Sequence, residues 1–230
     1  MHPMDLAPGL RLLERNISPL HAQLLKLFDS HFPTWNRFVD TEPMLWWPNE
    51  IPELAYGRVL LRRPHQGDVE EIYKGARDPE IPRFTTIPIE YTILHAQDYV
   101  DRVQTSLDIQ REIPFVIEFG GVFAGTISLH SINQKNLFAE IGYWVEKNLR
   151  HKGIGTTAVK LLTDFGFQTI GFKRIEALVD SENIYSQKLL LSAGYEKEGL
   201  MKSRSTKESG EQVDMVMLAA TTSNWTGLES

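Results

Sequence analysis

The sequence predicts a mixed α/β fold: one mostly antiparallel sheet flanked by helices, with a helical extension at the N-terminal end. Residues 113–119 and 122–132 are two apolar strand patterns joined by Gly120-Gly121, which is a signal for a hairpin turn. Further along the chain, strand patterns alternate with helical ones. Hairpin strands that come first, followed by strands separated by helices, favour a mixed sheet over a doubly wound parallel one.

Composition places the chain among globular proteins with one sizeable core. Its 230 residues are 42% hydrophobic and 23% charged, which is ordinary for that class. No apolar run is long enough to span a bilayer, and the first residues lack the basic and apolar regions of a secretion signal. Together with the absence of cysteine, this predicts a cytoplasmic protein without a membrane partner. It also excludes a disulfide or a cysteine nucleophile within this chain.

Charge and histidine spacing limit the partners further. The net charge of −6 argues against a nucleic-acid partner. The seven histidines show no metal-ligand spacing among themselves or with nearby carboxylates. No metal site is therefore predicted.

Residues 1–56 differ from the rest of the chain and are interpreted as a helical N-terminal extension. Ser18-Pro19 is a helix start, with serine as the N-cap and proline at the first helical position. Apolar residues then recur at helical spacing, and Pro33 ends or bends the helix. Three of the five tryptophans lie in this segment, so we expect it to pack on the core or on a partner. An exposed Trp46-Trp47 pair would indicate a homodimer contact.

The main domain is predicted over residues 57–220, and residues 221–230 form a C-terminal tail. It begins with a strand at residues 59–61 and a helix from its cap at Asp68 to residue 76. A proline-containing loop is expected over residues 77–89. Thr92 caps a helix that reaches about residue 110, and the hairpin strands follow.

The second half of the domain alternates strands and helices. A strand over residues 139–145 precedes a polar, glycine-bearing loop and a helix that ends near Gly171. Residues 174–179 form the next strand, and the helix over residues 183–193 ends at Gly194, which suits a left-handed cap. Residues 195–201 and 212–218 close the sheet as a hairpin across Ser209-Gly210.

The loop between residues 145 and 156 carries the most specific signal in the chain. Its sequence Arg-His-Lys-Gly-Ile-Gly, residues 150–155, precedes a helical pattern. The free N–H groups of a first helical turn favour an anion, and glycines let the backbone approach it closely. Cations beside a helix N-terminus are unfavourable by themselves, so three in a row indicate an anion that offsets them. We therefore expect a phosphate ligand here.

Two interpretations of this loop differ in the ligand. Residues 153–158 match the dinucleotide fingerprint G-x-G-x-x-A, with Glu176 or Asp180 as the acid that follows. In that motif, however, the loop follows its strand directly, whereas residues 146–152 intervene here and are strongly polar. The context therefore disfavours a dinucleotide.

Written as Arg-x-x-Gly-x-Gly, the same loop resembles the pyrophosphate loop of the GCN5-related N-acetyltransferase family. Residues 140–145 resemble that family's central strand. Residues 183–195 resemble its later Asn-x-x-Ser helix, closed by Gly194-Tyr195, and Gly210 with Asp214 resembles its last hairpin. The resemblance covers about residues 57–220 and is closest to the branch that acetylates ribosomal-protein N-termini.

The resemblance implies that acetyl-coenzyme A lies where two parallel strands splay apart at the centre of the sheet. On that basis the backbone of Tyr143, Trp144 and Val145 pairs with the pantetheine, while Asn183 and Ser186 lie beside it. The loop and helix start would hold the pyrophosphate through seven residues: Arg150, His151, Lys152, Gly153, Ile154, Gly155 and Thr156.

Acetyl transfer to an amine needs a base for the amine and an acid for the leaving thiolate. Many members of the family carry a tyrosine seven residues after the asparagine, but this position is Leu190 here. Ser186 is therefore the expected acid, as the resemblance to the ribosomal-protein branch implies. Glu140 is a carboxylate in an otherwise apolar strand and is the expected base. Alternative bases stay open at Glu176, Asp180 and His130.

The chain is thus predicted to be an acetyl-CoA-dependent N-acetyltransferase that needs no metal. The acceptor is a primary amine, either a protein N-terminus or a small molecule, with Arg83, Phe84 and Glu140 expected to contact it. Direct attack in a ternary complex is expected because the chain has no cysteine to carry the acetyl group. The alternative is a protein that binds acyl-CoA as a sensor or assembly module without catalysis, which Leu190 favours. An NAD-dependent oxidoreductase is the third hypothesis.

Overall fold

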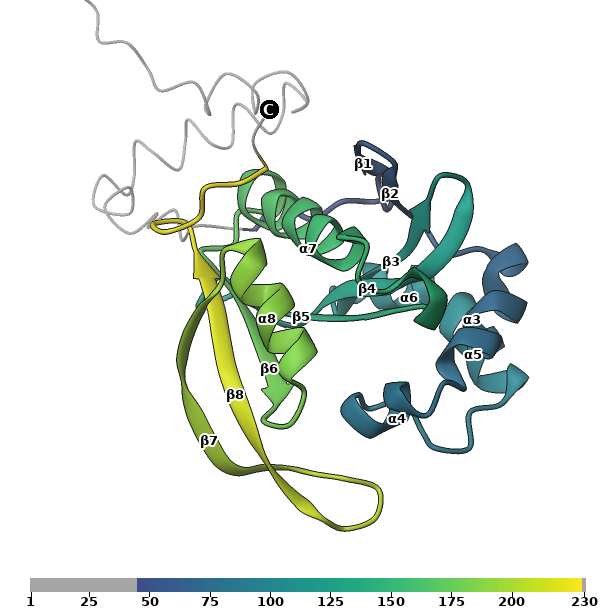
Figure 1. Ribbon diagram of the computed structural model, residues 1–230. Helices are drawn as coiled ribbons and strands as arrows, with labels where there is room; N and C mark the ends of the chain where they lie inside the picture. Colours follow the sequence, from purple (N-terminus) through teal and green to yellow (C-terminus); the bar gives the residue numbers. More distant parts are fainter. Residues whose placement is uncertain (1–44, 229–230) are drawn as a thin grey trace, which may run out of the picture. The chain divides into compact units, whose positions relative to one another are not determined.

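The computed structural model describes residues 45–228, so the helix predicted after Ser18-Pro19 lies outside the described residues. Within the described part, eight strands form one sheet in the order β1-β2-β3-β4-β5-β6-β8-β7 (Figure 1). The pair β5 and β6 is parallel, and the other neighbouring pairs are antiparallel. The predicted mixed, mostly antiparallel sheet with flanking helices is confirmed.

The strands follow the predicted apolar segments, except that β7 continues to Thr206, beyond its predicted end at residue 201, and that one strand is added. A three-residue strand, β1, precedes the first predicted strand and pairs with it. It is too short to carry a periodic signal in the sequence. The strand bounds are β1 Leu54–Tyr56, β2 Val59–Arg62, β3 Glu112–Phe119, β4 Val122–Asn133, β5 Phe138–Val145, β6 Arg174–Asp180, β7 Glu196–Thr206 and β8 Gln212–Thr221.

The helices connect these strands and cover both faces of the sheet. Their bounds are α3 Val69–Ala76, α4 Glu80–Phe84, α5 Ile93–Asp101, α6 Val103–Asp108, α7 Ile154–Phe165 and α8 Ile184–Ala193. Two 3-10 turns, η2 (Gln66–Asp68) and η3 (Lys147–Leu149), and a π-helical turn, η4 (Gly166–Ile170), complete them. Gly171 and Gly194 both have a left-handed conformation after their helices, as predicted.

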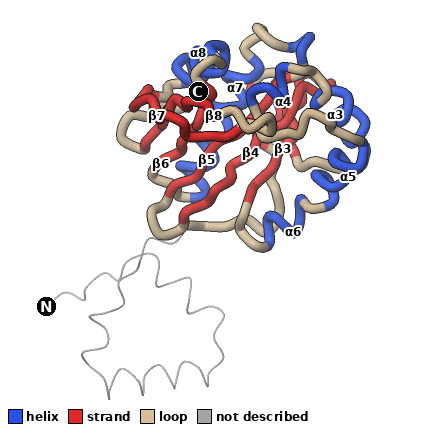
Figure 2. The backbone as a smooth tube through the Cα atoms, turned by 90° about the horizontal axis from the view of Figure 1, so that it is seen from below, coloured by secondary structure: helices blue, strands red, loops and turns tan. Residues whose placement is uncertain are grey.

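Two hydrophobic clusters divide the core between the faces of the sheet. The larger contains Leu129, Ile141 and Ile175 of the strands together with Ala158 and Leu162 of α7. The smaller contains residues of α3 and α5 packed against Phe123 of β4. Figure 2 shows α3 and α5 along one side of the strands. Successive side chains of a strand point to opposite faces of the sheet, so the side chains of β5 point alternately toward α7 and toward α3 and α5.

The parallel pair at the centre of the sheet separates soon after it begins. Strands β5 and β6 pair only from Phe138↔Arg174 to Glu140↔Glu176. Beyond these residues β5 continues to pair with β4, and β6 continues to pair with β8. The backbone edges of residues 141–145 and 177–180 thus face each other without pairing. This is the splayed central pair that the family resemblance implied.

Two predicted segments between β2 and β3 need correction. The loop predicted over residues 77–89 contains the five-residue helix α4, which starts after Pro79. Proline is tolerated at a helix start, so the prolines here mark a helix as well as a loop. The single helix predicted to extend from Thr92 to residue 110 is two helices, because α5 ends at Asp101 and α6 begins at Val103. Thr92 does cap α5, accepting a hydrogen bond from the N–H of His95.

Residues at both ends of the described chain pack on the domain. The indole N–H of Trp47 donates to the carbonyl of Leu107 at 2.7 Å, and Ile51 is buried. The indole N–H of Trp225 donates to Asp164 of α7 at 2.6 Å. Trp46, by contrast, is 55% exposed. The domain limits at residues 57 and 220 stay predictions.

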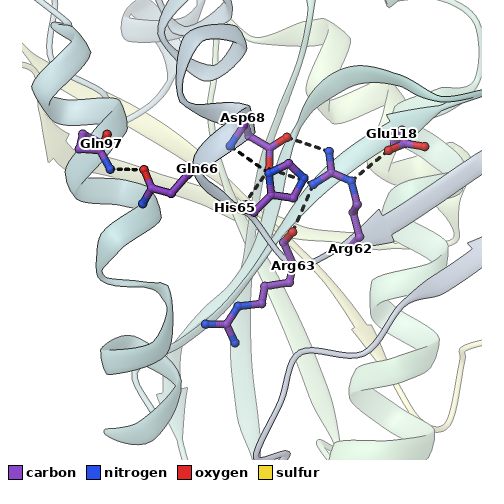
Figure 3. A network of polar contacts seen from close by, with 8 residues as sticks. Arg62, Arg63, His65, Gln66, Asp68, Gln97 and Glu118 are labelled. Carbon is purple, nitrogen blue, oxygen red and sulfur yellow. Dashed lines mark hydrogen bonds and ion pairs between the residues drawn. The ribbon is translucent and has the colours of Figure 1, made fainter.

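A buried ion-pair network fixes the connection from β2 to α3 (Figure 3). The guanidinium of Arg62 donates two hydrogen bonds to Asp68, at 2.7 and 2.9 Å, and one to Glu118 at 3.0 Å. The Asp68 carboxylate also accepts from the N–H of His65 at 2.8 Å. Asp68 precedes α3, but its side chain makes no capping hydrogen bond to that helix. The predicted capping role of Asp68 is therefore wrong. The carboxylate instead joins the helix start to two strands.

This network makes the Asp68 carboxylate a source of pH-dependent stability. Burial alone raises the pKa of the Asp68 carboxyl, but hydrogen bonds from Arg62 and His65 outweigh it and hold that pKa below 3.8. A carboxyl whose pKa is lower in the folded state stabilises the fold above its unfolded pKa. That stabilisation is lost as the pH falls through the folded pKa.

Replacing the carboxylate, as in Asp68→Asn, should lower the free energy of unfolding by about 1.5–3 kcal/mol near neutral pH, because charged hydrogen bonds are lost. The difference from the wild type should shrink as the pH falls below about 4, because the contribution of Asp68 decreases from there toward its lower folded-state pKa. Urea unfolding at pH 7 and pH 3 measures both. The control is Glu71→Gln, which breaks an exposed pair with Lys74 and should change little. A difference that is the same at both pH values would contradict this account.

Candidate active site

A large cleft follows the splayed strands through the sheet. Its volume is about 1680 Å³, and it reaches both faces of β5. Ligand pockets commonly measure about 300–1,000 Å³, so this one is large enough for an extended molecule with a second ligand beside it. Most of its lining comes from β5, β6, the start of α7, α8, the segment from Arg77 to Arg102 and the β7–β8 hairpin, and residues of α3, β3 and β4 complete it. All predicted site residues except Lys152 lie in this lining.

The loop before α7 exposes the N–H groups of a helix start. His151 and Gly153 both have left-handed backbone conformations, with φ of 61° and 78°. These turns bring the chain sharply into α7, and Gly153 provides no capping side chain. The first turn holds no acidic residue either. The N–H groups of Ile154, Gly155 and Thr156 therefore point into the cleft end without a side-chain acceptor, which is the arrangement that binds a phosphate.

Gly155 has a second, steric role at the start of α7. A Cβ placed there would lie 2.6 Å from Cδ1 of Leu189 on α8 and 3.3 Å from Cγ2 of Val145 on β5. A glycine therefore lets α7 start in direct contact with both elements. The loop is thus positioned by packing against the two walls of the cleft.

Arg150 holds the loop in place and is not a free cation. One guanidinium nitrogen donates to Asp78 at 2.6 Å, and Nε donates to the carbonyl of Val145 at 2.9 Å. The side chain thus connects the end of β5 with the segment before α4. The positive charge of Arg150 is offset by Asp78, which the sequence did not reveal because it lies 72 residues earlier. His151 and Lys152 are exposed, and His151 contacts the ring of Tyr185 edge-on.

Asn183 and Ser186 lie together at the start of α8. The side-chain oxygen of Asn183 accepts from the N–H of Ser186 at 3.1 Å, so Asn183 is the N-cap of this helix. The Asn-x-x-Ser spacing therefore has a local structural cause. Its side-chain amide nitrogen has no partner among the described residues and lines the cleft.

The hydroxyl groups of Ser186 and Tyr143 are hydrogen-bonded at 2.8 Å. Tyr143 lies on β5 just beyond the end of the parallel pairing, with its ring toward α8. Burial raises the pKa of the Tyr143 phenol well above its usual value, although the bond to Ser186 lowers it in part. The phenol therefore keeps its proton at neutral pH.

A row of titratable side chains crosses the opposite face of the sheet. His130 of β4 is directly opposite Glu112 of β3 on one side and Glu140 of β5 on the other. Glu140 is in turn opposite Glu176 of β6. Residues opposite each other on neighbouring strands point to the same face, so these four form one row.

The members of the row differ in their partners. Glu176 accepts from Arg174 at 2.6 Å and does not line the cleft. Glu140 makes no ion pair with any residue that the structure describes, and it lines the cleft together with His130 and Glu112. The imidazole of His130 lies over Gly142, where a Cβ would come within 2.8 Å of Nε2. The structure thus brings Glu140 and His130 together and removes Glu176 from the site.

The outer part of this face is closed by α4 and the hairpin tip. Arg83 and Phe84 lie at the end of α4 with the guanidinium of Arg83 over the Phe84 ring, and both line the cleft. The N–H of Ile89 donates to Glu208 at the hairpin tip at 3.2 Å. This contact could not be predicted, because nothing in either segment indicates how far the β7–β8 hairpin extends. Trp144 also faces this side but is buried against Gly75 of α3 and Phe123.

Comparison with known proteins identifies this arrangement. A family profile described as "Acetyltransferase (GNAT) domain" matches residues 58–196. The chain belongs to the GNAT acetyltransferase family. The match includes β2 to the end of α8, and therefore the splayed strands, the glycine loop and the Asn-x-x-Ser helix. The family that the sequence motifs indicated is confirmed.

Three relatives illustrate the similarity. The chain is 32% identical over 164 residues to the "Uncharacterized N-acetyltransferase p20" of Bacillus licheniformis, which covers 70% of this chain and 92% of that protein. Over 90 residues it is 32% identical to "Spermidine N(1)-acetyltransferase" of Escherichia coli strain K12, which covers 39% of this chain and 48% of that enzyme. The structure of Mycobacterium smegmatis RimJ in complex with CoA-disulfide superimposes with a TM-score of 0.70 at 25% identity, covering 77% of this chain and 91% of that one.

The protein is therefore an acetyl-CoA-dependent N-acetyltransferase, and acetyl-CoA is its cosubstrate. A dinucleotide oxidoreductase would carry its glycine loop in a parallel sheet, whereas β5 and β6 are the one parallel pair of the sheet described for residues 45–228. Within those residues, no three His, Asp or Glu side chains are grouped to hold a metal ion. No helix in the same range is both long and apolar enough to cross a membrane.

The contact of Gly155 with α8 can be tested by Gly155→Ala. We expect the free energy of unfolding to fall by about 1–3 kcal/mol, because the added methyl group overlaps Leu189. The same substitution should cost less in a Leu189→Ala background, where the overlapping atoms are absent. Gly199→Ala is the matched control, since its Cβ meets nothing within 4 Å. Equal costs of Gly155→Ala in the two backgrounds, measured by urea unfolding, would show that Leu189 is not the cause.

Proposed function

We propose that the protein transfers the acetyl group of acetyl-CoA directly to a primary amine, with both substrates bound in one ternary complex. The observation that carries this proposal is the single cleft through the splayed strands, which opens on both faces of β5. One face holds the phosphate-binding loop and α8, and the other holds Glu140 and His130. The absence of cysteine from the chain supports direct attack, because no thiol can accept the acetyl group first.

The donor would bind along the inner edges of β5 and β6. Its pantetheine would pair with the backbone of Tyr143, Trp144 and Val145, which has no strand partner on that side. Its pyrophosphate would accept hydrogen bonds from the N–H groups at the start of α7, from Gly153 to Thr156. The Val145 carbonyl already accepts from Arg150, so the pairing would end there. Asn183 would offer its unpaired amide nitrogen to the donor.

The acceptor would enter from the face of α3 and α5. There the carboxylate of Glu140 lies at the point where the strands separate, without an ion pair among the described residues. A carboxylate in this position attracts a cationic amine and can take its proton, directly or through a water molecule. Arg83 and Phe84 would line the outer wall of the acceptor pocket. On the other face, Ser186 would donate a proton to the leaving thiolate.

The names of relatives support two classes of acceptor. A "Putative ribosomal N-acetyltransferase" of Bacillus subtilis is 30% identical over 109 residues, and the Escherichia coli relative acts on spermidine. We favour a protein N-terminal amine, because the sequence motifs resemble the ribosomal-protein branch and the Bacillus subtilis relative is named for a ribosomal acceptor. The hairpin tip and α4 would then contact the first residues of the acceptor chain. A homodimer contact through the exposed Trp46 is part of the same proposal.

Thermal unfolding with acetyl-CoA, CoA and NADH tests the donor site. At 100 times the dissociation constant, acetyl-CoA and CoA should each stabilise the fold by about 2.7 kcal/mol, and NADH should not. Gly155→Ala should reduce the shift, because the loop is displaced from its packed position. Absence of a shift with either CoA species would overturn the assignment of the loop.

A panel of amines separates catalysis from binding alone. Release of CoA in the presence of short peptides with free N-termini, but not of N-terminally blocked ones, is the expected result. Release with spermidine instead would favour the second class of acceptor. Binding of acetyl-CoA without turnover of any amine would favour the sensor hypothesis that Leu190 suggests.

Glu140→Gln should lower kcat/KM by about 10²-fold or more, because it removes the base but keeps the shape of the side chain. Its binding of acetyl-CoA should stay unchanged, since the base acts on the acceptor. The control is Glu176→Gln, on the neighbouring strand directly opposite, where the carboxylate accepts from Arg174 outside the cleft. Similar losses in both variants would show that Glu140 acts through general charge and not as the base.

A further inference from the structure

The proposed acid, Ser186, cannot by itself supply a proton to the thiolate. A serine hydroxyl is a weaker acid than a phenol, so the alkoxide left when Ser186 gives up its proton is costly unless Ser186 receives another proton at the same time. The residue at the usual acid position, Leu190, is fully buried and apolar. The site therefore needs a second proton donor in contact with Ser186.

Tyr143 is that contact. Its phenolic oxygen is 2.8 Å from Oγ of Ser186, within the normal range for a hydrogen bond between hydroxyl groups. It lies three residues after Glu140 on β5 and therefore on the other face of the sheet, away from the base. Both Tyr143 and Ser186 line the cleft. Among the described residues, no other tyrosine hydroxyl is hydrogen-bonded to Ser186.

The helix start fixes this pair in one geometry. Asn183 accepts from the backbone N–H of Ser186 and so holds the first turn of α8 in position. The phenolic oxygen of Tyr143 also lies 3.5 Å from the Ser186 carbonyl. Because both residues line the cleft, a proton that the Ser186 hydroxyl receives from the phenol can pass on to a ligand bound there.

We propose that Tyr143 is the proton source for the leaving thiolate and that Ser186 relays the proton. This inference rests on the proposed function and extends it by one residue. The amine nitrogen forms a bond to the thioester carbon, the carbon–sulfur bond breaks, and sulfur keeps the electron pair. Sulfur then takes the proton of Ser186 while Ser186 takes the proton of Tyr143. The amine loses its own proton to Glu140 on the other face, Glu140 releases that proton to water, and water returns a proton to Tyr143.

The chain contains a matched structural control for this bond. Tyr195 is buried, and its hydroxyl is 2.8 Å from Oγ1 of Thr163, so it makes the same kind of bond with the same length. Burial raises the pKa of both phenols well above the usual value. Tyr195 and Thr163 do not line the cleft. Removing either phenolic oxygen therefore perturbs folding in a similar way, but only Tyr143 can affect proton transfer.

The first experiment compares Tyr143→Phe with Tyr195→Phe in single-turnover acetyl transfer. Tyr143→Phe should lower the rate constant by about 10²-fold or more, with the dissociation constant of acetyl-CoA unchanged. Tyr195→Phe should lower the melting temperature by a similar amount without changing the rate constant. For the relay, Ser186→Ala should match Tyr143→Phe, and Ser186→Thr should retain most of the activity because it keeps a hydroxyl group.

The second experiment changes the leaving group, which a structural role would not sense. A selenolate leaves without protonation at neutral pH, because selenols are much stronger acids than thiols. With acetyl-seleno-CoA as donor, Tyr143→Phe and Ser186→Ala should therefore regain most of the wild-type rate, whereas Glu140→Gln should not. The double variant Tyr143→Phe/Ser186→Ala should be no slower than either single variant, because both act in one relay.

A defect in Tyr143→Phe that persists with the seleno donor would overturn the relay, and so would a defect of equal size in Tyr195→Phe. The proposed function fails in a different way. In that case the wild-type protein would bind acetyl-CoA but release no CoA with any amine. If the wild type releases CoA normally and Tyr143→Phe does so at the same rate, the proposed acetyltransferase function stands. Only the role of Tyr143 is then refuted.

Discussion

The early end of pairing between β5 and β6 is the constraint on which the rest of the site depends. Paired strands satisfy their backbone groups with each other, and here the pairing covers only residues 138–140 and 174–176. Beyond it, each strand is held by its other neighbour, β4 or β8, so the sheet stays intact while one internal edge of each strand is free. An extended amide-containing ligand such as pantetheine can satisfy those edges as a further strand would. Arg150 bonds to the last carbonyl of β5 and to Asp78, which fixes the end of the opening.

In the mechanism that we propose, the same strand separates the two proton transfers. Side chains of β5 alternate between faces, so Glu140 lies with His130 on the side of α3 and α5, and Tyr143 lies with Ser186 on the side of α8. At about 3.3 Å per residue, the two positions are about 10 Å apart along the strand. An acid and a base on one face would exchange their proton with each other. Placed on opposite faces with the reacting carbonyl between them, each has one partner in the reaction. Gly142 between them carries no side chain, which leaves room for His130 above it.

Much of this arrangement was accessible from the sequence, and the reasons for the rest are physical. Strand periodicity, Gly120-Gly121 and the capping glycines are local signals, and they predicted the hairpins and helix ends. The loop and the Asn-x-x-Ser helix are contiguous motifs and predicted the family. Contacts between distant segments could not be predicted in this way. The hydrogen bonds that join Asp78 to Arg150 and Ile89 to Glu208 depend on loop packing. Strand register brings together the row formed by Glu112, His130 and Glu140. Tyr143 was expected to contribute its backbone, and its hydroxyl was missed because only the position of α8 shows where the ring leads.

In the mechanism that we propose, the phenol that many family members carry at the position of Leu190 comes instead from Tyr143 on β5. Leu190 is fully buried and belongs to the hydrophobic core, so α8 gains packing where a phenol would have required a polar partner. Tyr143 provides a phenol from the opposite wall of the same opening, and the Ser186 hydroxyl spans the distance that remains. In the proposed arrangement the open edge of β5 binds the donor, and the face of the same strand carries the phenol that reaches α8.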